Sequence, residues 1–503
     1  MKRGAEVLVN CADADKFRDC ESPVLLGPMD HATQNFLPLT VVFVYRREKS
    51  ESEKVIPSGK LRRALARLLD YYPHLTGRLV MNGEDNTPQI EKLGTGVRFV
   101  TAECSEPLEA FEAVAEDEKP GSPPRLIVTN LPGGGNALLP PFASTTILAV
   151  QHTRFACGGV SIGICIPHII CDAAGFFQLV RDLAELYRGF RDVELGDRQA
   201  NDVKLLRPPH IGSHMAELHN MTLQERQEAL TFQPTVVKLA PEKEAPATGT
   251  STAIDKTIYP PVTGRILRFS SHELTALKAE ANASGRGQPL STFCALTAHI
   301  WQCVFRARVR LREAQGKTPV DAAQLVPRQI LMSVDLRSWN QLEGIPPQYF
   351  PNGVVSPVLS VPVAQLLNGP LSSVAASIRE SVQPQDPIEM KKTLRWIAAQ
   401  SDKRRVQPRY NYDEEGVFVT QWSKFDMYRG AQFEAPPAVV AQPFTAHSLY
   451  DGLAYFMATE DQLTQSVDTT GITTGSLDVS LALSEPIWAI LDGDMHFRRH
   501  RSR

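Results

Sequence analysis

Two segments before the middle of the chain carry the clearest strand pattern. From Gly159 to Ile166, large apolar side chains alternate with Ser, Gly and Cys, which is the period of two that a β-strand imposes. The run from Thr145 to Phe155 predicts a second strand, joined to the first through residues 156–159. Because one face of the later strand carries only small residues, we expect another part of the chain to pack very closely against that face.

Helical patterns, with apolar residues three and four positions apart, flank these strands. One runs from Lys60 to Tyr71 and ends before Pro73, and another runs from Ala174 to Arg188, where Gly189 is expected to stop it. The second half contains a helical run through Leu274–Lys278, a helix from the cap-like Ser291 to about Arg308, a strand from Ser476 to Leu483, and a last helix capped by Ser484 with Pro486 in its first turn.

The segment from Gln233 to Gly264 has neither period and is rich in Pro, Thr and Ala, which is typical of a linker. A chain of 503 residues is also too long for one hydrophobic core, since single cores stop growing near about 250–300 residues. We therefore predict an α/β (α+β) architecture with an N-terminal domain at 1–232, a crossover linker at 233–264 and a C-terminal domain at 265–503.

Composition and charge exclude several classes of protein. The formal net charge of −3 gives no reason to expect nucleic acid or an anionic membrane as a partner, and no window approaches the roughly 20 apolar residues of a membrane span. The eight cysteines form no CxxC pair, which argues against a metal site and a disulfide scaffold and favours a cytoplasmic location. The basic tail, residues 498–503, is expected to be a frayed, solvated end.

The candidate chemistry lies at His168 and Asp172, an HxxxD motif at the predicted strand-to-helix connection. A histidine there faces the space beyond the sheet edge, and its ordinary pKa near about 6.5 suits a general base. The residues alone leave a second interpretation open, a hydrogen-bonded structural histidine. A second HxxxD, His447 to Asp451, runs into what looks like an ordinary strand, so we interpret it as a chance match.

The context of the first motif resembles the signature of the BAHD acyltransferases, QxTxFxCGGxxxGxxxxHxxxD. The matching positions are Gln151, Thr153, Phe155, Cys157, Gly158, Gly159, Gly163, His168 and Asp172. Further segments resemble family landmarks in the same order: residues 69–79 ("LxxYPxLAGRL"), 291–308 ("STFxALxAHxWxxxxRAR"), 334–352 ("VDxRxR…PPxPxxYFGN") and 420–422 ("TSW"). The resemblance thus covers nearly the whole chain.

This resemblance implies two chloramphenicol-acetyltransferase-like domains, each a mixed sheet with flanking helices, and a channel between them. An acyl-CoA, with acetyl-CoA as the default, would meet a small-molecule hydroxyl or amine that His168 deprotonates, without an acyl-enzyme. Trp422 and Thr420 would stabilise the oxyanion, although Trp422 could also be a core aromatic residue. Asp172 would turn away from the histidine to pair with Arg337. The resemblance further places Ser291 and Thr292 near the pantetheine arm.

The family's second hallmark, DFGWG, is not preserved in residues 424–437, where Phe433 alone corresponds. That loss weakens the case for coenzyme A over a carrier-bound acyl group. Three functions therefore remain open: an acyl-CoA-dependent transferase of secondary metabolism, a carrier-dependent condensation-type enzyme, and a non-catalytic metabolite-binding member. We expect a cytoplasmic monomer with no permanently bound cofactor and no metal.

Overall fold

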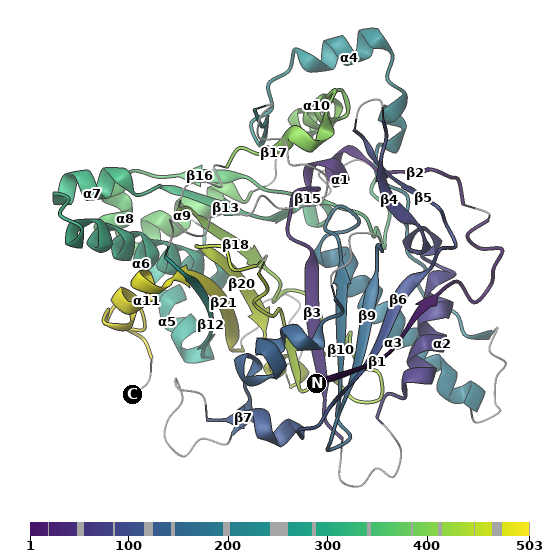
Figure 1. Ribbon diagram of the computed structural model, residues 1–503. Coiled ribbons are helices and arrows are strands. Elements are labelled where there is room, and N and C mark those ends of the chain that lie inside the picture. The colour runs from purple at the N-terminus through teal and green to yellow at the C-terminus, as the bar shows by residue number, and fades with distance from the viewer. Residues whose placement is uncertain are drawn as a thin grey trace.

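The computed structural model places the chain in two lobes, each built on one six-stranded mixed sheet (Figure 1). It describes residues 1–501 except 19, 48–54, 84–85, 115–123, 142–145, 195–201, 242–259, 284–287, 340–343, 384–385, 411–414, 447 and 465–474. The two-lobed α/β architecture with mixed sheets is the one that the sequence predicts. No helix in the described part of the chain is long and apolar enough to cross a membrane.

The first sheet has the strand order β1-β6-β9-β10-β3-β19, with β6 and β9 parallel and the other neighbours antiparallel. Its strands are β1 (Lys2–Val9), β3 (Leu39–Tyr45), β6 (Val97–Cys104), β9 (Ala149–Phe155), β10 (Val160–Ile166) and β19 (Val439–Ala441). The helices α2 (Ser58–Leu69) and α3 (Ala173–Glu194) add to the core of this lobe. The helices α1 (Pro28–Ala32) and α4 (Leu223–Leu230) contact α10 (Pro387–Ala398) of the C-terminal half. The smaller strands of this lobe are β2 (Val24–Leu25), β4 (Arg78–Met81), β5 (Pro88–Glu91), β7 (Glu112–Ala113) and β8 (Arg125–Leu126).

The second sheet has the order β12-β21-β20-β18-β13-β16, in which β18 is parallel to both of its neighbours. Its strands are β12 (Val262–Phe269), β13 (Gln329–Met332), β16 (Val358–Ser360), β18 (Val417–Gln421), β20 (Leu453–Ala458) and β21 (Leu477–Ser484). The helices are α5 (Ser271–Ala281), α6 (Thr292–Ala314), α7 (Pro319–Leu325), α8 (Val363–Leu367), α9 (Leu371–Ser381), α10 (Pro387–Ala398) and α11 (Glu485–Asp492). The short strands β11 (Val237–Leu239) and β17 (Val406–Pro408) pair with each other, as do β14 (Val334–Asp335) and β15 (Val354–Val355).

The close packing predicted on the small face of β10 is confirmed. A side chain at Gly163 would come within 2.1 Å of the Leu138 carbonyl oxygen, which belongs to the 3₁₀ segment Pro132–Leu138. On the other face, Ile162, Ile164 and Ile166 are buried in the core of the lobe. The strand that leads to the HxxxD motif is thus held tightly from both sides.

The predicted end of α3 at Gly189 is wrong, because the helix continues to Glu194. A Cβ atom at this position would lie 2.7 Å from Cγ1 of Val203, so the glycine lets that buried side chain pack against the helix backbone. A glycine inside a helix costs only about 1 kcal/mol relative to Ala, which such packing can offset.

The predicted linker, residues 233–264, is described only at its two ends. Its first part contains β11, β12 already begins at Val262, and residues 242–259 lie outside the described part. The C-terminal half also contributes a strand to the first sheet, because β19 pairs with β3. Phe433, just before β19, packs edge-on against Tyr45 and Tyr187, so the altered DFGWG segment still fastens the two lobes together.

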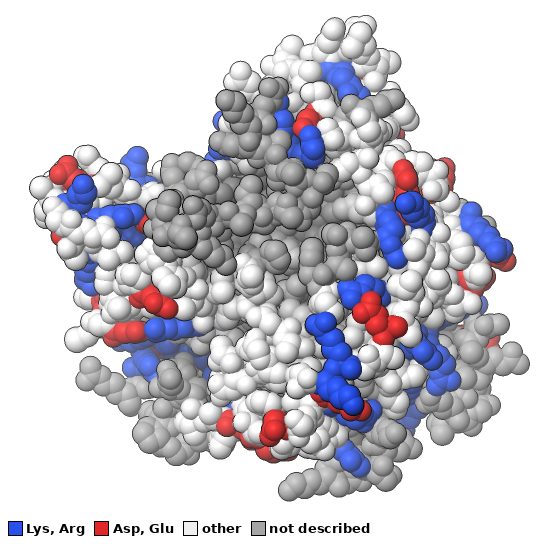
Figure 2. Space-filling view, in the orientation of Figure 1, with Lys and Arg blue, Asp and Glu red and all other residues white. Residues whose placement is uncertain are grey.

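The prediction that the basic tail is a frayed end is wrong for residues 498–500. Arg498 donates to the buried Glu273 carboxylate at 3.0 Å, and Arg499 donates to Glu280 at 2.7 Å. His500 Nε2 lies 2.9 Å from the same Glu280. The prediction failed because these acids belong to α5, more than 200 positions earlier in the chain. Elsewhere, charges of both signs are interspersed on the face that Figure 2 shows, as expected for a nearly balanced net charge.

Candidate active site

His168 lies in the turn between β10 and α3, where the sequence places it. The turn is closed by the Ile170 N–H, which donates to the Pro167 carbonyl at 3.1 Å. His168 as a whole residue is half-buried, and its ring meets the edge of Phe36 with centroids 5.1 Å apart. The turn and the contact with Phe36 thus fix where the imidazole lies.

One ring nitrogen of His168 has a defined partner. Its Nδ1 lies 3.2 Å from Oδ1 of Asn352. The Asn352 amide nitrogen donates to Asp30 Oδ1 at 2.9 Å and to the His168 carbonyl at 2.9 Å, so the amide oxygen is the group left to face the ring. An amide oxygen only accepts hydrogen bonds, and Nδ1 therefore carries the proton. The lone pair is then on Nε2.

Asp30 anchors this arrangement from α1. Its carboxylate accepts from the backbone N–H groups of Gly27 at 2.9 Å and Asn352 at 3.0 Å, in addition to the Asn352 side chain. Burial raises the pKa of Asp30 to about 6, against the hydrogen bonds from Asn352, Ser213 and Gly27. Every one of these partners is a donor, so the arrangement is complete when Asp30 is ionised. Burial also lowers the pKa of His168, while the nearby Asp172 acts in the opposite direction, so the imidazole is neutral near pH 7.

The predicted pairing of Asp172 with Arg337 is confirmed. The guanidinium binds both carboxylate oxygens, Nη1 to Oδ2 at 2.8 Å and Nη2 to Oδ1 at 3.1 Å. The backbone N–H groups of Gly353 and Gly175 donate to the same carboxylate at 2.8 and 3.1 Å. Burial acts to raise the pKa of Asp172, but Arg337 and these donors outweigh it and the pKa is lowered. Asp172 thus caps α3 and ties it to the segment that carries Asn352.

Thr420 and Trp422 lie at the end of β18, on the face of the second sheet that meets the first lobe. Phe418, two residues earlier on the same face, packs against the core of the first lobe, and Trp422 belongs to that core. The indole packs edge-on against Phe177 and Tyr455, with centroids 5.7 and 4.9 Å apart. Both the oxyanion role and the core role of Trp422 remain compatible with this position.

Ser291 and Thr292 start α6. The Ser291 side chain accepts from the Cys294 N–H at 3.2 Å, which confirms the predicted cap. Ser291 is exposed, and among the described residues neither side chain has a contact that places it next to His168. Their role toward the pantetheine arm stays a prediction.

The second HxxxD is only partly described, because His447 lies outside the described residues. Its aspartate, Asp451, accepts from Nη2 of the buried Arg308 at 2.9 Å. Arg308 also donates to the Gly416 carbonyl at 3.0 Å. The following segment forms β20, as the sequence predicts.

Asn352 and Asp30 are the site residues that the sequence predictions missed. Asn352 falls in a segment that resembles a family landmark, but no pattern assigns it a contact with His168. Asp30 lies 322 positions before its amide partner, and no local periodicity reveals such a contact.

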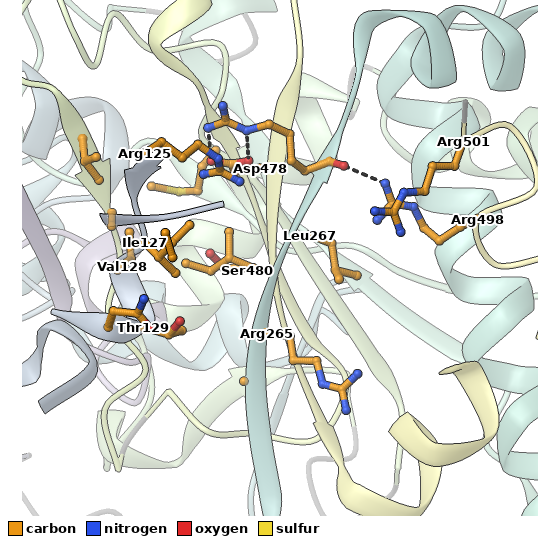
Figure 3. Close-up of a pocket in the computed structure, with 18 of the residues that line it drawn as sticks. Arg125, Ile127, Val128, Thr129, Arg265, Leu267, Asp478, Ser480, Arg498 and Arg501 are labelled. Atoms are coloured by element: carbon orange, nitrogen blue, oxygen red, sulfur yellow. Dashed lines mark hydrogen bonds and ion pairs between the residues drawn. The ribbon is translucent and has the colours of Figure 1, made fainter. Parts of the chain in front are cut away.

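Two cavities flank the region where the lobes meet. The larger, about 1410 Å³, is lined by β8, β12, β21 and the tail, and Figure 3 shows Arg125, Arg265, Arg498 and Arg501 around it. Ser480 and Ile266, which line it, share a cross-strand row with Thr420 through Tyr455, so part of the cavity lies on the same sheet face as Thr420. Arg265 and Leu267 line it from the other face of β12. The smaller cavity, here called the niche, is lined by Met29, Ala32, Thr33, Phe36, Val236, Val237, Val354, Val355, Ser356, Met390, Thr393, Leu394, Ile397 and Pro408.

Comparisons with known proteins agree with this geometry. A family model described as the Transferase family matches residues 24–467. A hydroxycinnamoyl-CoA:5-hydroxyanthranilate N-hydroxycinnamoyltransferase of Avena sativa is 25% identical over 96% of each chain, and an anthranilate N-benzoyltransferase of Dianthus caryophyllus is 27% identical over 69% of this chain and 68% of its own.

Solved structures share the fold. Vinorine synthase superposes with a TM-score of 0.63 at 16% identity, over 97% of this chain and 96% of its own. F. sporotrichioides TRI101 complexed with coenzyme A and T-2 gives a TM-score of 0.62 at 16% identity, over 95% and 99%. The family model spans most of the chain and the fold agrees over nearly all of it, so the chain belongs to the Transferase family and is a BAHD acyltransferase.

Proposed function

We propose that this enzyme transfers an acyl group from a coenzyme A thioester to a hydroxyl or amine of a small-molecule secondary metabolite, with His168 as the general base. The observation that carries the proposal is the contact of His168 Nδ1 with the Asn352 amide oxygen. It leaves a lone pair on Nε2 of a neutral imidazole. The matched family and the coenzyme A named for the TRI101 structure support the thioester donor.

The reaction follows from this tautomer. Nε2 takes the proton of the acceptor hydroxyl or amine as its oxygen or nitrogen attacks the thioester carbonyl carbon, and a tetrahedral intermediate forms. A positioned base contributes about 10²–10⁴-fold to the rate. In the imidazolium that results, Nδ1 keeps its proton and donates a hydrogen bond to the Asn352 amide oxygen. The amide nitrogen of Asn352 in turn donates to the Asp30 carboxylate. That carboxylate favours the charged ring in the transition state.

The negative charge on the former carbonyl oxygen needs a donor. Thr420 and Trp422 are our candidates, since both lie on the interface side of the second sheet. One such donor contributes about 10²–10³-fold. When the intermediate collapses, the carbon–sulfur bond breaks, the coenzyme A thiolate leaves, and Nε2 returns its proton to that sulfur.

The large cavity is our candidate for the nucleotide end of the donor. The part of it around Ser480 and Ile266 lies on the same sheet face as Thr420, and the arginines that line the cavity offer positive charge to phosphates. Several of these arginines already have acidic partners, for example Arg265 with Asp492 at 2.7 Å. Acetyl-CoA is the first donor to test, followed by the hydroxycinnamoyl and benzoyl thioesters that the names of the relatives suggest.

Release of free thiol distinguishes the three open functions. Wild-type protein is mixed with acyl-CoA and a panel of hydroxylated and amino metabolites, and both the thiol and the mass of the acceptor are measured. We expect thiol release with a matching mass gain of the acceptor, and its loss in His168→Ala. Release that needs a loaded carrier protein would favour the condensation-type function, and acceptor binding without any release would favour the non-catalytic one.

A further inference from the structure

The niche adjoins the candidate base. Phe36 lines it and also meets the His168 ring, and Thr33 lines it while its hydroxyl donates to the His168 carbonyl at 3.3 Å. Val354 and Val355 line it two and three residues after Asn352. One aromatic ring therefore separates the niche from the imidazole.

The walls of the niche are apolar, with three hydroxyl-bearing residues among them and no charged side chain. Two of these hydroxyls, on Ser356 and Thr393, are buried without a hydrogen-bond partner in the described part of the chain. Ser356 is 6% exposed and Thr393 only 1%. A threonine inside a helix usually donates to the carbonyl four residues earlier, yet Thr393 of α10 does not.

A buried hydroxyl without a partner costs free energy, so each such group calls for a physical explanation. Here two orphan hydroxyls lie in the wall of the same small cavity beside the base. The free volume of about 20 Å³ has room for one oxygen-bearing group, since a water molecule needs about 10–15 Å³.

We propose that the niche is the end of the acceptor pocket, and that it takes the apolar tip of an acceptor that carries a single uncharged oxygen, such as an ether or a carbonyl. Ser356 and Thr393 donate to this oxygen. The inference rests on the proposed function, because it places the nucleophilic group of the same acceptor at His168.

The niche suits the acceptor better than the donor for two reasons. Its lining includes no residue of β18 or β20, the strands next to which the thioester carbonyl would meet Thr420 and Trp422. It also has no cationic side chain for the phosphates of coenzyme A. If the thioester is aligned with Thr420, the side of His168 next to the niche is free for the acceptor.

The test uses primary alkanols and their ω-methoxy analogues of equal chain length as probes. Binding is measured by calorimetry and turnover by thiol release with acetyl-CoA. We expect the wild type to prefer the methoxy probe of the fitting length by about 10-fold, the value of one well-placed hydrogen bond. The double variant Ser356→Ala/Thr393→Val is expected to lose this preference through KM, with kcat and the KM for acetyl-CoA unchanged.

Thermal unfolding of the free proteins supplies an independent readout. Thr393→Val removes an orphan hydroxyl at nearly constant volume and is expected to raise the midpoint by one or more degrees while it weakens probe binding. The matched control is Thr297→Val on α6, whose hydroxyl is also buried without a partner in the described part, but in the core of the second lobe. It is expected to raise the midpoint and leave the probe preference intact.

The outcomes separate the niche from the chemistry. A methoxy preference in binding that persists in His168→Ala, without turnover in the wild type, supports the niche and overturns the proposed function. Turnover without any preference, or a preference that survives the double variant, overturns the niche alone. A change in acyl-CoA selectivity instead of acceptor selectivity would assign the niche to the donor and also overturn our proposal.

Discussion

The two HxxxD motifs of this chain both contain an aspartate bound to an arginine, and they differ in how firmly that aspartate is held. In both, the aspartate binds an arginine from a distant segment: Asp172 binds Arg337, and Asp451 binds Arg308. Asp172 is buried and holds its arginine through two hydrogen bonds, with two backbone N–H groups in addition. Asp451 is partly exposed and accepts one hydrogen bond from Arg308.

The comparison shows that an arginine-bound aspartate does not by itself identify a catalytic motif. The assignment of the first motif rests instead on the described surroundings of His168: a turn at the end of a buried strand, an amide that sets the tautomer, and a carboxylate that binds this amide. The aspartate contributes by fixing the backbone on which the histidine lies.

The largest difference between the motifs is expected in turnover. His168→Ala removes the proposed base and should lower kcat by about 10²–10⁴-fold. His447→Ala should leave kcat within about 3-fold of the wild type, because we assign no chemistry to that position. Thiol release under saturating acyl-CoA measures both, and the opposite pattern would mean that the wrong histidine was chosen.

Stability should separate the two aspartates. Asp172→Asn breaks a buried ion pair and is expected to cost about 3 kcal/mol of unfolding free energy. Asp451→Asn should cost about 1 kcal/mol, since Arg308 keeps its bonds to the Glu415 and Gly416 carbonyls. Urea denaturation measures the two costs; equal values would contradict the assignment of Asp172 as the main anchor.

The carboxylate behind Asn352 should be visible in the pH profile. Asp30→Asn removes a negative charge two hydrogen bonds from the imidazole, which lowers the pKa of His168. We expect the acidic limb of kcat/KM to move to lower pH by about 0.5–1 unit, and the plateau to fall. A lower plateau with an unmoved limb would indicate that Asp30 only supports the fold.

The last prediction concerns acid stability. Because the pKa of Asp172 is lowered in the folded protein, its contribution to stability is complete above the ordinary value of 3.8 and is lost as the pH falls further through the folded pKa. Comparison of the wild type with Asp172→Asn between pH 5 and pH 2, by urea denaturation, should show the two stabilities converging at the acidic end. A constant difference would contradict the lowered pKa.

Much of the architecture follows from local pattern. The alternation from Gly159 to Ile166 predicts both the strand and the close approach of another segment, and Ser291 predicts the start of α6. The end of α3 did not follow, because the packing of Val203 onto Gly189 depends on a later part of the chain. The docking of the tail and the transfer of β19 to the first sheet are likewise decided by distant partners.

The residues of the site also fall into those that the sequence predicts and those that distant contacts decide. His168, Asp172 and Arg337 were predicted because they fall in segments that resemble a family signature, and the ion pair of the last two is confirmed. The contact of Asn352 with His168 and the role of Asp30 were not predicted, since buried hydrogen bonds across more than 180 positions leave no local pattern. The residues of the niche come from α1, β11, β15, α10 and β17 and from positions just outside them, which the fold alone brings together.

The most direct test of the mechanism is the tautomer of His168. Nitrogen-15 NMR of histidine-labelled protein near pH 7.5, with His168→Gln to assign the resonance, reports which ring nitrogen carries the proton. We predict a neutral ring with the proton on Nδ1 and an unprotonated Nε2. A proton on Nε2, in either the other neutral tautomer or the imidazolium, would leave no base at the proposed atom and contradict the account.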